Sequence, residues 1–192
     1  MKPGTPVLRT GTEANAAEPD EMLMARFLGG DSAAFDALFV RHAGRVHAYL
    51  RRMVGPATAD DLTQTTFLSI VRSRERFQHG ARFRPWLYAI AGNAARDFVR
   101  RARFEKPTED GETPEHVVEV LPSDPLLERA VQRALAQLPV QQREAIVLHR
   151  FEGFSFGEIA ETLGLTESAV KVRAHRGYVR LRELLAHLGE GP

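Results

Sequence analysis

The chain contains no cysteine among its 192 residues. This absence excludes disulfide bonds, thiolate zinc sites and a cysteine nucleophile. Long apolar runs are also missing, since no window approaches the ~18 apolar residues that a membrane-spanning helix needs. The N-terminus lacks the apolar run of a secretory signal, so we expect a cytoplasmic protein with no membrane insertion.

Recognisable catalytic motifs are absent as well. The 7 histidines are scattered, and no H-E-x-x-H, P-loop or nucleophile motif occurs. His42 and His47 are spaced poorly for one face of a helix. We therefore predict no catalytic residue, no metal site, no cofactor and no enzymatic activity.

A net charge of +1 conceals an uneven distribution of charge along the chain. Arginines dominate between positions 72 and 103, where the only acids are Glu75 and Asp97. Acids dominate between positions 104 and 124, where the only basic residue is Lys106. The chain thus carries a basic patch followed by an acidic connector, and a second basic segment near its C-terminus.

Apolar residues recur at helical spacing through most of the chain, and no segment alternates as a strand would. Four helices are expected in the first half. The first two are capped by Asp20 and Asp31, the third begins near Thr58 to Asp61, and the fourth has Pro85 in its first turn. Helices resume at Pro125, after an acidic segment that contains three prolines.

These elements predict an all-α fold of two small helical domains, 20–104 and 125–188. A flexible acidic linker at 105–124 joins them, and residues 1–19 are expected to form a disordered leader. Fully extended at ~3.3 Å per residue, the linker reaches roughly 70 Å. That reach is comparable with two turns of DNA at ~34 Å each.

The stretch from Ser155 to Leu185 has the features of a helix-turn-helix. Ser155 and Glu158 fit a capping box, Gly164 suits a left-handed C-cap and Thr166 suits the next N-cap. The second helix carries lysine and arginine but no acid between positions 168 and 182. A short helix, a glycine-containing turn and a basic second helix favour reading of the DNA major groove.

Two longer runs carry a family resemblance. The chain resembles region 2 of bacterial sigma factors in the run ADDLTQTTFLSIVR followed by FRPWLYAIAGNAARDFVRR. It resembles region 4 of the same factors in the run LPVQQREAIVLHRFEGFSFGEIAETLGLTESAVKVRAHRGYVRLREL. With only these two regions joined by a linker, the chain resembles RNA polymerase sigma factors of the extracytoplasmic-function class (ECF, group 4).

The resemblance implies a factor that binds core RNA polymerase, recognises the −35 and −10 promoter elements and aids promoter melting. It implies contacts with the clamp helices of the largest polymerase subunit and with the β-flap, and an anti-sigma factor as a further partner. The alternative is a stand-alone helix-turn-helix transcription regulator, which would bind duplex DNA specifically without polymerase.

By this resemblance, the third helix docks on the clamp helices. Acids, an amide and an aromatic ring on adjoining turns suit a protein partner better than they suit polyanionic DNA. The candidate polymerase-binding residues are Asp60, Asp61, Leu62, Gln64 and Phe67. The alternative is that the two acids only begin the helix and that Leu62 and Phe67 only belong to the core.

The fourth helix and the loop before it combine arginines with aromatic residues, as binding of single-stranded nucleic acid requires. By resemblance, the loop captures a flipped non-template base and the helix reads the −10 element. The candidate residues are His79, Arg82, Arg84, Trp86, Asn93, Arg96 and Arg100. Core packing is an alternative for Trp86, and a solvated face is one for the arginines. Gly92 departs from the family, in which a larger, often basic residue is usual.

Recognition of the −35 element is carried over to the second helix of the helix-turn-helix. Arginine or lysine can bond O6 and N7 of guanine, whereas a valine can contact a thymine methyl group. The candidate residues are Lys171, Val172, Arg173, His175, Arg176 and Arg180. The alternative is a solvated basic face on an ordinary helical hairpin.

Overall fold

The computed structural model describes residues 18–78, 80–105 and 125–186. Every regular element within these ranges is a helix, which confirms the predicted all-α class. The predicted leader and linker lie almost entirely outside the described residues, and so does His79. Among the described residues, no helix combines the length and the apolar character needed to cross a bilayer.

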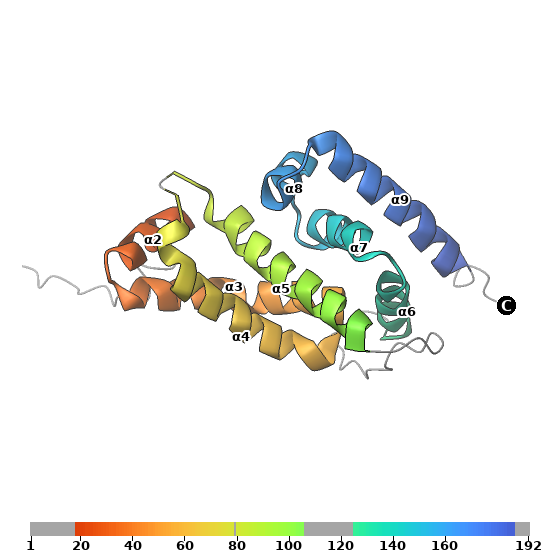
Figure 1. Ribbon diagram of the computed structural model, residues 1–192, viewed down its shortest axis with the longest axis horizontal. Helices are drawn as coiled ribbons and strands as arrows, with labels where there is room; N and C mark the ends of the chain where they lie inside the picture. The colour runs from red at the N-terminus through yellow and green to blue at the C-terminus, as the bar shows by residue number, and fades with distance from the viewer. Residues whose placement is uncertain (1–17, 79, 106–124, 187–192) are drawn as a thin grey trace, which may run out of the picture.

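The described residues of the first part of the chain form four α-helices, and α5 packs on α3, α4 and α8 (Figure 1). Long apolar stripes on α3 and α5 bury Val46, Leu50 and Leu87 between the helices. The bounds are α2 Asp20–Leu28, α3 Ser32–Val54, α4 Pro56–Ser73, the 3-10 turn η1 Arg74–Arg76 and α5 Phe83–Glu105.

The predicted starts of these helices were partly wrong. Asp31 caps α3 by accepting a hydrogen bond from the Ala33 N–H at 3.0 Å, as expected. Asp20 is not a cap, because the N-cap of α2 is Pro19. The third helix already starts at Pro56. The fourth starts at Phe83, and Pro85 lies in its first turn as expected, where a missing N–H costs nothing.

The described residues of the second part of the chain, 125–186, form four α-helices and one π-helical turn. Its bounds are α6 Pro125–Ala136, α7 Val140–Ile146, the π turn η2 Val147–Phe151, α8 Phe156–Leu163 and α9 Glu167–Leu185. The π turn directly continues α7, and its widened backbone precedes the loop that leads into α8.

The helix-turn-helix forms as predicted. Ser155 and Glu158 complete the capping box, with Glu158 accepting the Ser155 N–H at 2.9 Å and Ser155 accepting the Glu158 N–H at 3.2 Å. Gly164 ends α8 in the left-handed conformation at φ 64°, which glycine adopts without a Cβ penalty. Thr166 then caps α9 by accepting the Ala169 N–H at 3.2 Å.

One face of α9 packs closely against α7. Val170, Ala174 and Gly177 are buried along this face. A Cβ added to Gly177 would lie 2.6 Å from Cδ1 of Ile146, so a larger residue here would push the two helices apart. The buried stripe of small residues therefore sets the distance of α9 from α7 and leaves the opposite face free.

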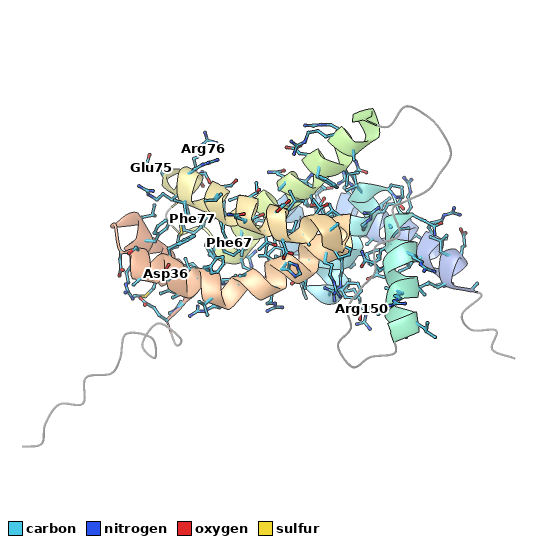
Figure 2. The ribbon with its side chains drawn as sticks, turned by 90° about the horizontal axis from the view of Figure 1, so that it is seen from below. Asp36, Phe67, Glu75, Arg76, Phe77 and Arg150 are labelled. Carbon is cyan, nitrogen blue, oxygen red and sulfur yellow. The ribbon has the colours of Figure 1, made fainter. Side chains whose placement is uncertain are left out.

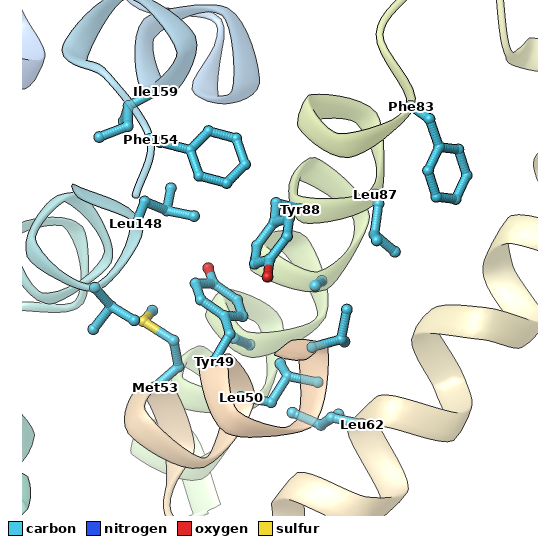
Figure 3. Packing of buried hydrophobic residues seen from close by; sticks show 14 of the residues in the cluster. Tyr49, Leu50, Met53, Leu62, Phe83, Leu87, Tyr88, Leu148, Phe154 and Ile159 are labelled. Atoms are coloured by element: carbon cyan, nitrogen blue, oxygen red, sulfur yellow. The ribbon is translucent and has the colours of Figure 1, made fainter. Parts of the chain in front are cut away.

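The core is continuous across both parts of the chain. Tyr49 and Tyr88 of the first part lie with their ring centroids 5.2 Å apart, and Phe154 of the second part lies 5.1 Å from Tyr88. Figure 3 shows the two tyrosines facing Leu148 and Phe154 across the junction. The two predicted domains thus pack against each other through aromatic contacts that the sequence did not predict.

Candidate nucleic-acid interface

The face of α9 opposite the buried stripe is basic and exposed. Lys171 is 56% exposed and Val172 is 49% exposed, and His175 and Arg176 lie beside them at the surface. Arg173 is half-buried. An exposed run of cations with one apolar side chain can contact phosphates, guanine edges and a thymine methyl group.

The ion pairs on α9 are local and solvated. Lys171 Nζ lies 2.6 Å from Glu167, and Arg180 lies 3.1 Å from Glu183, each partner being at least 52% exposed. Such surface pairs stabilise a helix little and can exchange for a phosphate partner. They therefore leave the basic face available to DNA.

Unlike the basic face of α9, the polar face of α5 is partly covered by helices of the second part of the chain. Arg82 is paired with Glu158 at 3.0 Å and also with Glu161. Arg84 donates to the main-chain oxygen of Glu152. The arginines at the start of α5 are thus held by carboxylates and carbonyls from α8 and the loop before it.

Further along α5, Asn93 and Arg96 lie together. Asn93 is exposed, and its side-chain oxygen accepts a hydrogen bond from Arg96. Arg96 also pairs with Glu144 of α7. Arg100, 67% exposed, is paired with Asp97 at 3.0 Å. A groove of about 270 Å³ between α4 and α5 runs past Asn93.

Trp86 is half-buried rather than displayed as a stacking platform. Its ring lies 5.1 Å from the Phe77 ring and 6.2 Å from the Phe83 ring, measured between centroids. Packing within the core accounts for most of its surface. Part of the side chain remains exposed, so the two interpretations of Trp86 are compatible.

The surface of α4 presents an acid–amide face next to α3. Asp60 is 89% exposed and lies 3.1 Å from Nε2 of His47, while Asp61 and Gln64 are exposed. A hollow of about 390 Å³ separates α3 and α4 at this point, and Phe39 lines it with 42% of its surface exposed.

Two of the candidate polymerase-binding residues do not belong to this surface. Leu62 is 7% exposed and Phe67 is 3% exposed. Figure 2 shows Phe67 directed into the helical bundle, where its ring lies 4.8 Å from that of Phe39. These two side chains support the α4 surface from beneath, as the core alternative for Leu62 and Phe67 expects.

Sequence reasoning missed the contribution of α3 to this surface. Phe39 and the 81% exposed Val40 of α3 stand at the surface. Two consecutive apolar residues beside Phe35 and Leu38 make a stripe wider than one helix face can bury. The excess width of this apolar stripe was the sequence signal that could have predicted exposed apolar residues on α3.

The junction of the two parts holds buried charged groups that the sequence did not reveal. Burial raises the pKa of Glu144, while Arg96 and the Tyr49 hydroxyl, 3.3 Å away, oppose that rise. Burial also lowers the pKa of Arg143 to about 10, and its guanidinium donates to the Met53 and Leu138 main-chain oxygens. Tyr88 donates to Glu152 at 2.5 Å.

Comparisons with known proteins agree with this architecture. The family described as Sigma-70 region 2 matches residues 38–105, and Sigma-70 region 4 matches residues 128–181. The chain is 48% identical over 168 residues to RNA polymerase sigma factor CarQ of Myxococcus xanthus, covering 86% of this chain and 97% of that one. It is 38% identical over 178 residues to ECF RNA polymerase sigma factor SigM of Mycobacterium tuberculosis, covering 90% of this chain and 87% of that one.

The helical arrangement and the two matched regions define a sigma factor of the sigma-70 family. Within that family, the chain belongs to the ECF RNA polymerase sigma factors, the transcription initiation factors built from regions 2 and 4. The stand-alone regulator considered above is therefore set aside.

Solved structures support the same fold. CnrH, solved in complex with the cytosolic domain of CnrY, superposes with a TM-score of 0.69 at 29% identity, covering 88% of this chain and 99% of that one. The sigma factor RpoE of Bartonella quintana, solved with the anti-sigma factor NepR, superposes with a TM-score of 0.66 at 24% identity, covering 79% of this chain and 96% of that one.

Proposed function

We propose that the basic face of α9 reads the −35 element in the major groove. The observation that carries this assignment is the division of α9 into a buried stripe of small residues and an exposed cationic face. Lys171 and Arg176 are placed to contact guanine edges, Val172 to contact a thymine methyl group, and Arg180 to bind a phosphate. Arg173 and His175 complete the same face.

The exposed face of α5 reads the melted −10 strand in this proposal. Asn93 supplies an exposed amide beside the groove between α4 and α5, and Arg100 supplies a cation one turn beyond Arg96. Arg82, Arg84 and Arg96 already hold carboxylate or carbonyl oxygens, and the same guanidinium groups suit phosphate oxygens. The preceding loop, including His79, captures the flipped base.

Core RNA polymerase binds the surface formed by α3 and α4. Asp60, Asp61 and Gln64 supply its polar contacts, and Phe39 supplies an apolar contact beside the hollow between the helices. The clamp helices of the largest subunit are the proposed partner of this surface, and the β-flap is the proposed partner of the second part of the chain. The chain itself performs no catalysis, since the polymerase supplies the chemistry.

Regulation by an anti-sigma factor and action in the cytoplasm complete the proposal. CnrH was solved in complex with the cytosolic domain of CnrY, and RpoE, which shares the fold, was solved with the anti-sigma factor NepR. A related partner that covers the promoter-binding faces would hold this factor inactive. Binding to polymerase and promoter DNA places the active factor in the cytoplasm.

Transcription in vitro from a promoter library, with core polymerase and this factor, tests the proposed function. We expect transcripts from a promoter subset that shares −35 and −10 sequences at a fixed spacing. Core polymerase without the factor serves as the control. Absence of initiation that depends on the factor would overturn the assignment of these surfaces.

A further inference from the structure

The arginines assigned to the −10 element are occupied by the second part of the chain. Arg96 is paired with Glu144 of α7, and Arg82 is paired with Glu158 and Glu161 of α8. The guanidinium of Arg84 lies 4.3 Å above the Phe154 ring, where it also donates to the Glu152 main chain. Three cations expected to hold promoter DNA therefore hold protein groups instead.

Glu144 makes the deepest of these contacts. Its side chain is 1% exposed, and its carboxylate contacts both Arg96 of α5 and the Tyr49 hydroxyl of α3. A carboxylate is buried only where ionic and hydrogen-bonding partners replace water. Arg96 and the Tyr49 hydroxyl thus form a polar site on the first part of the chain that suits the carboxylate carried by α7.

Gly92 makes room for this carboxylate. A Cβ added to Gly92 would overlap Oε1 of Glu144 and would lie 3.1 Å from the Arg96 guanidinium and 3.2 Å from the Tyr49 hydroxyl. All three neighbours belong to the contact between the two parts of the chain. The absence of a side chain at Gly92 therefore leaves room for the contact between the two parts.

We propose that the free factor adopts a closed state in which Glu144, seated against Gly92, and the carboxylates of α8 occupy the −10 arginines. Promoter DNA and these glutamates compete for the same guanidinium groups, so Arg82 and Arg96 become available to DNA only when α7 and α8 move away. The basic face of α9 stays exposed in this state, with Val172 49% exposed and Lys171 56% exposed. Closure therefore blocks −10 binding and leaves −35 binding open.

The contacts are of a kind that a partner can open. The pairs made by Arg82 are largely exposed, and exposed pairs contribute little free energy. Burial of the Glu144 carboxylate removes its hydration, which opening restores. The aromatic contact of Phe154 with Tyr88 keeps the parts together until a partner that binds the open state shifts the equilibrium.

A pair of glycine substitutions tests the closed state without DNA. Gly92→Ala and Gly44→Ala both replace a glycine inside a long helix, but a Cβ at Gly44 meets nothing within 4 Å. Because the full chain has no native cysteine, Arg72→Cys and Ala186→Cys provide single label sites at exposed positions in the two parts. Electron spin resonance then measures the distance between two nitroxide labels.

We expect one narrow distance distribution for the parent chain and for Gly44→Ala, and a broad, longer distribution for Gly92→Ala. Circular dichroism should show unchanged helix content in both variants, since alanine favours a helix. A broad distribution in the parent chain, or an unchanged distribution in Gly92→Ala, would overturn the proposal.

The competition with DNA rests on the proposed function and needs a separate readout. The probe is a fluorescent single strand that carries the −10 non-template sequence of a promoter selected with core polymerase. If nine-tenths of the parent chain is closed, Gly92→Ala should bind this strand about tenfold more tightly, because apparent affinity scales with the competent fraction. A broadened distance with unchanged affinity would overturn the masking of the −10 face and count against the −10 assignment itself.

Discussion

At the scale of single residues, Asp20 joins the start of α2 to the middle of α3. Its carboxylate lies 2.8 Å from Nε2 of His42 and also pairs with Arg41. Burial acts on Asp20 to raise its pKa, but the hydrogen bonds and charges of His42 and Arg41 outweigh it and leave the pKa lowered. The side chain predicted to cap a helix instead bonds two residues of the neighbouring helix.

A lowered pKa makes this contribution to stability dependent on pH. The stabilising contribution of Asp20 is fully present above the pKa of an unfolded aspartate, near 3.9. It is lost as the pH falls through the lower pKa that Asp20 has in the folded chain. Asp20→Asn should therefore decrease the free energy of unfolding by about 1 kcal/mol at pH 7. The difference from the parent chain should shrink below about pH 4.

Urea unfolding at several pH values measures this difference, and Asp36→Asn is the matched control. Asp36 is an exposed acid on α3, labelled in Figure 2. The control should stay within about 0.5 kcal/mol of the parent at each pH. An Asp20→Asn effect of constant size from pH 3 to pH 7 would show that charge is not the cause.

Residue patterns predicted some side chains well and others not at all. Ser155, Gly164 and Thr166 were predictable because capping depends on neighbours only a few positions away. Glu144 was not, because its partners Tyr49 and Arg96 are far away in sequence. A glutamate in an amphipathic helix looks like any solvated acid until the opposing surface is known.

At the scale of elements, the caps of α8 and α9 determine the turn that orients the DNA-facing helix. Ser155→Ala and Thr166→Ala each remove an acceptor for an orphan N–H, so each should decrease the free energy of unfolding by about 1 kcal/mol. Ser168→Ala, at an exposed position in the first turn of α9, should change it by less than about 0.5 kcal/mol. Chemical denaturation measures all three, and equal values for the cap variants and the control would contradict the capping role.

The exposed face of α9 gives a second prediction at this scale. Lys171→Ala and Arg176→Ala should each weaken binding of the holoenzyme to its preferred −35 sequence by about 1–3 kcal/mol, with smaller losses on altered −35 sequences. Arg182→Ala, near the end of the same helix, should weaken binding equally on all sequences if it contacts DNA only through phosphate. Competition binding with −35 variants measures these losses, and a uniform loss for Lys171→Ala and Arg176→Ala would make them phosphate contacts.

The helical class and most helix positions followed from periodicity, since apolar stripes must face a core whatever the tertiary contacts are. Helix starts were less predictable. Pro56 begins α4 earlier than the apolar pattern indicates, because a first turn needs no buried residue, whereas α5 begins at Phe83, which is itself buried. The π turn at Val147–Phe151 has no local signal in the sequence.

At the scale of the whole molecule, regions 2 and 4 share one core. Tyr88 is buried against Phe154 and donates to Glu152, so the junction combines apolar packing with polar contacts. In the sequence, each of these residues could equally serve as a core or surface residue of its own region. The junction therefore could not be predicted from the sequence. In the proposed closed state, three arginines assigned to the −10 element are occupied, whereas the basic face of α9 is free.

In this arrangement, polymerase both recruits the factor and makes the arginines of its −10 face available to DNA. The factor alone should bind duplex DNA weakly and with strong salt dependence, through α9. Promoter opening should require core polymerase, because the arginines of α5 are occupied in the free chain.

Fluorescence of 2-aminopurine placed in the −10 element of a selected promoter tests this claim most directly, since the base brightens when it leaves the duplex stack. We predict no increase with the factor alone or with core polymerase alone, and a clear increase with both together. An Arg96→Ala factor should lose most of that increase while retaining helix content. An increase with the factor alone, or none with the complete holoenzyme, would contradict the account.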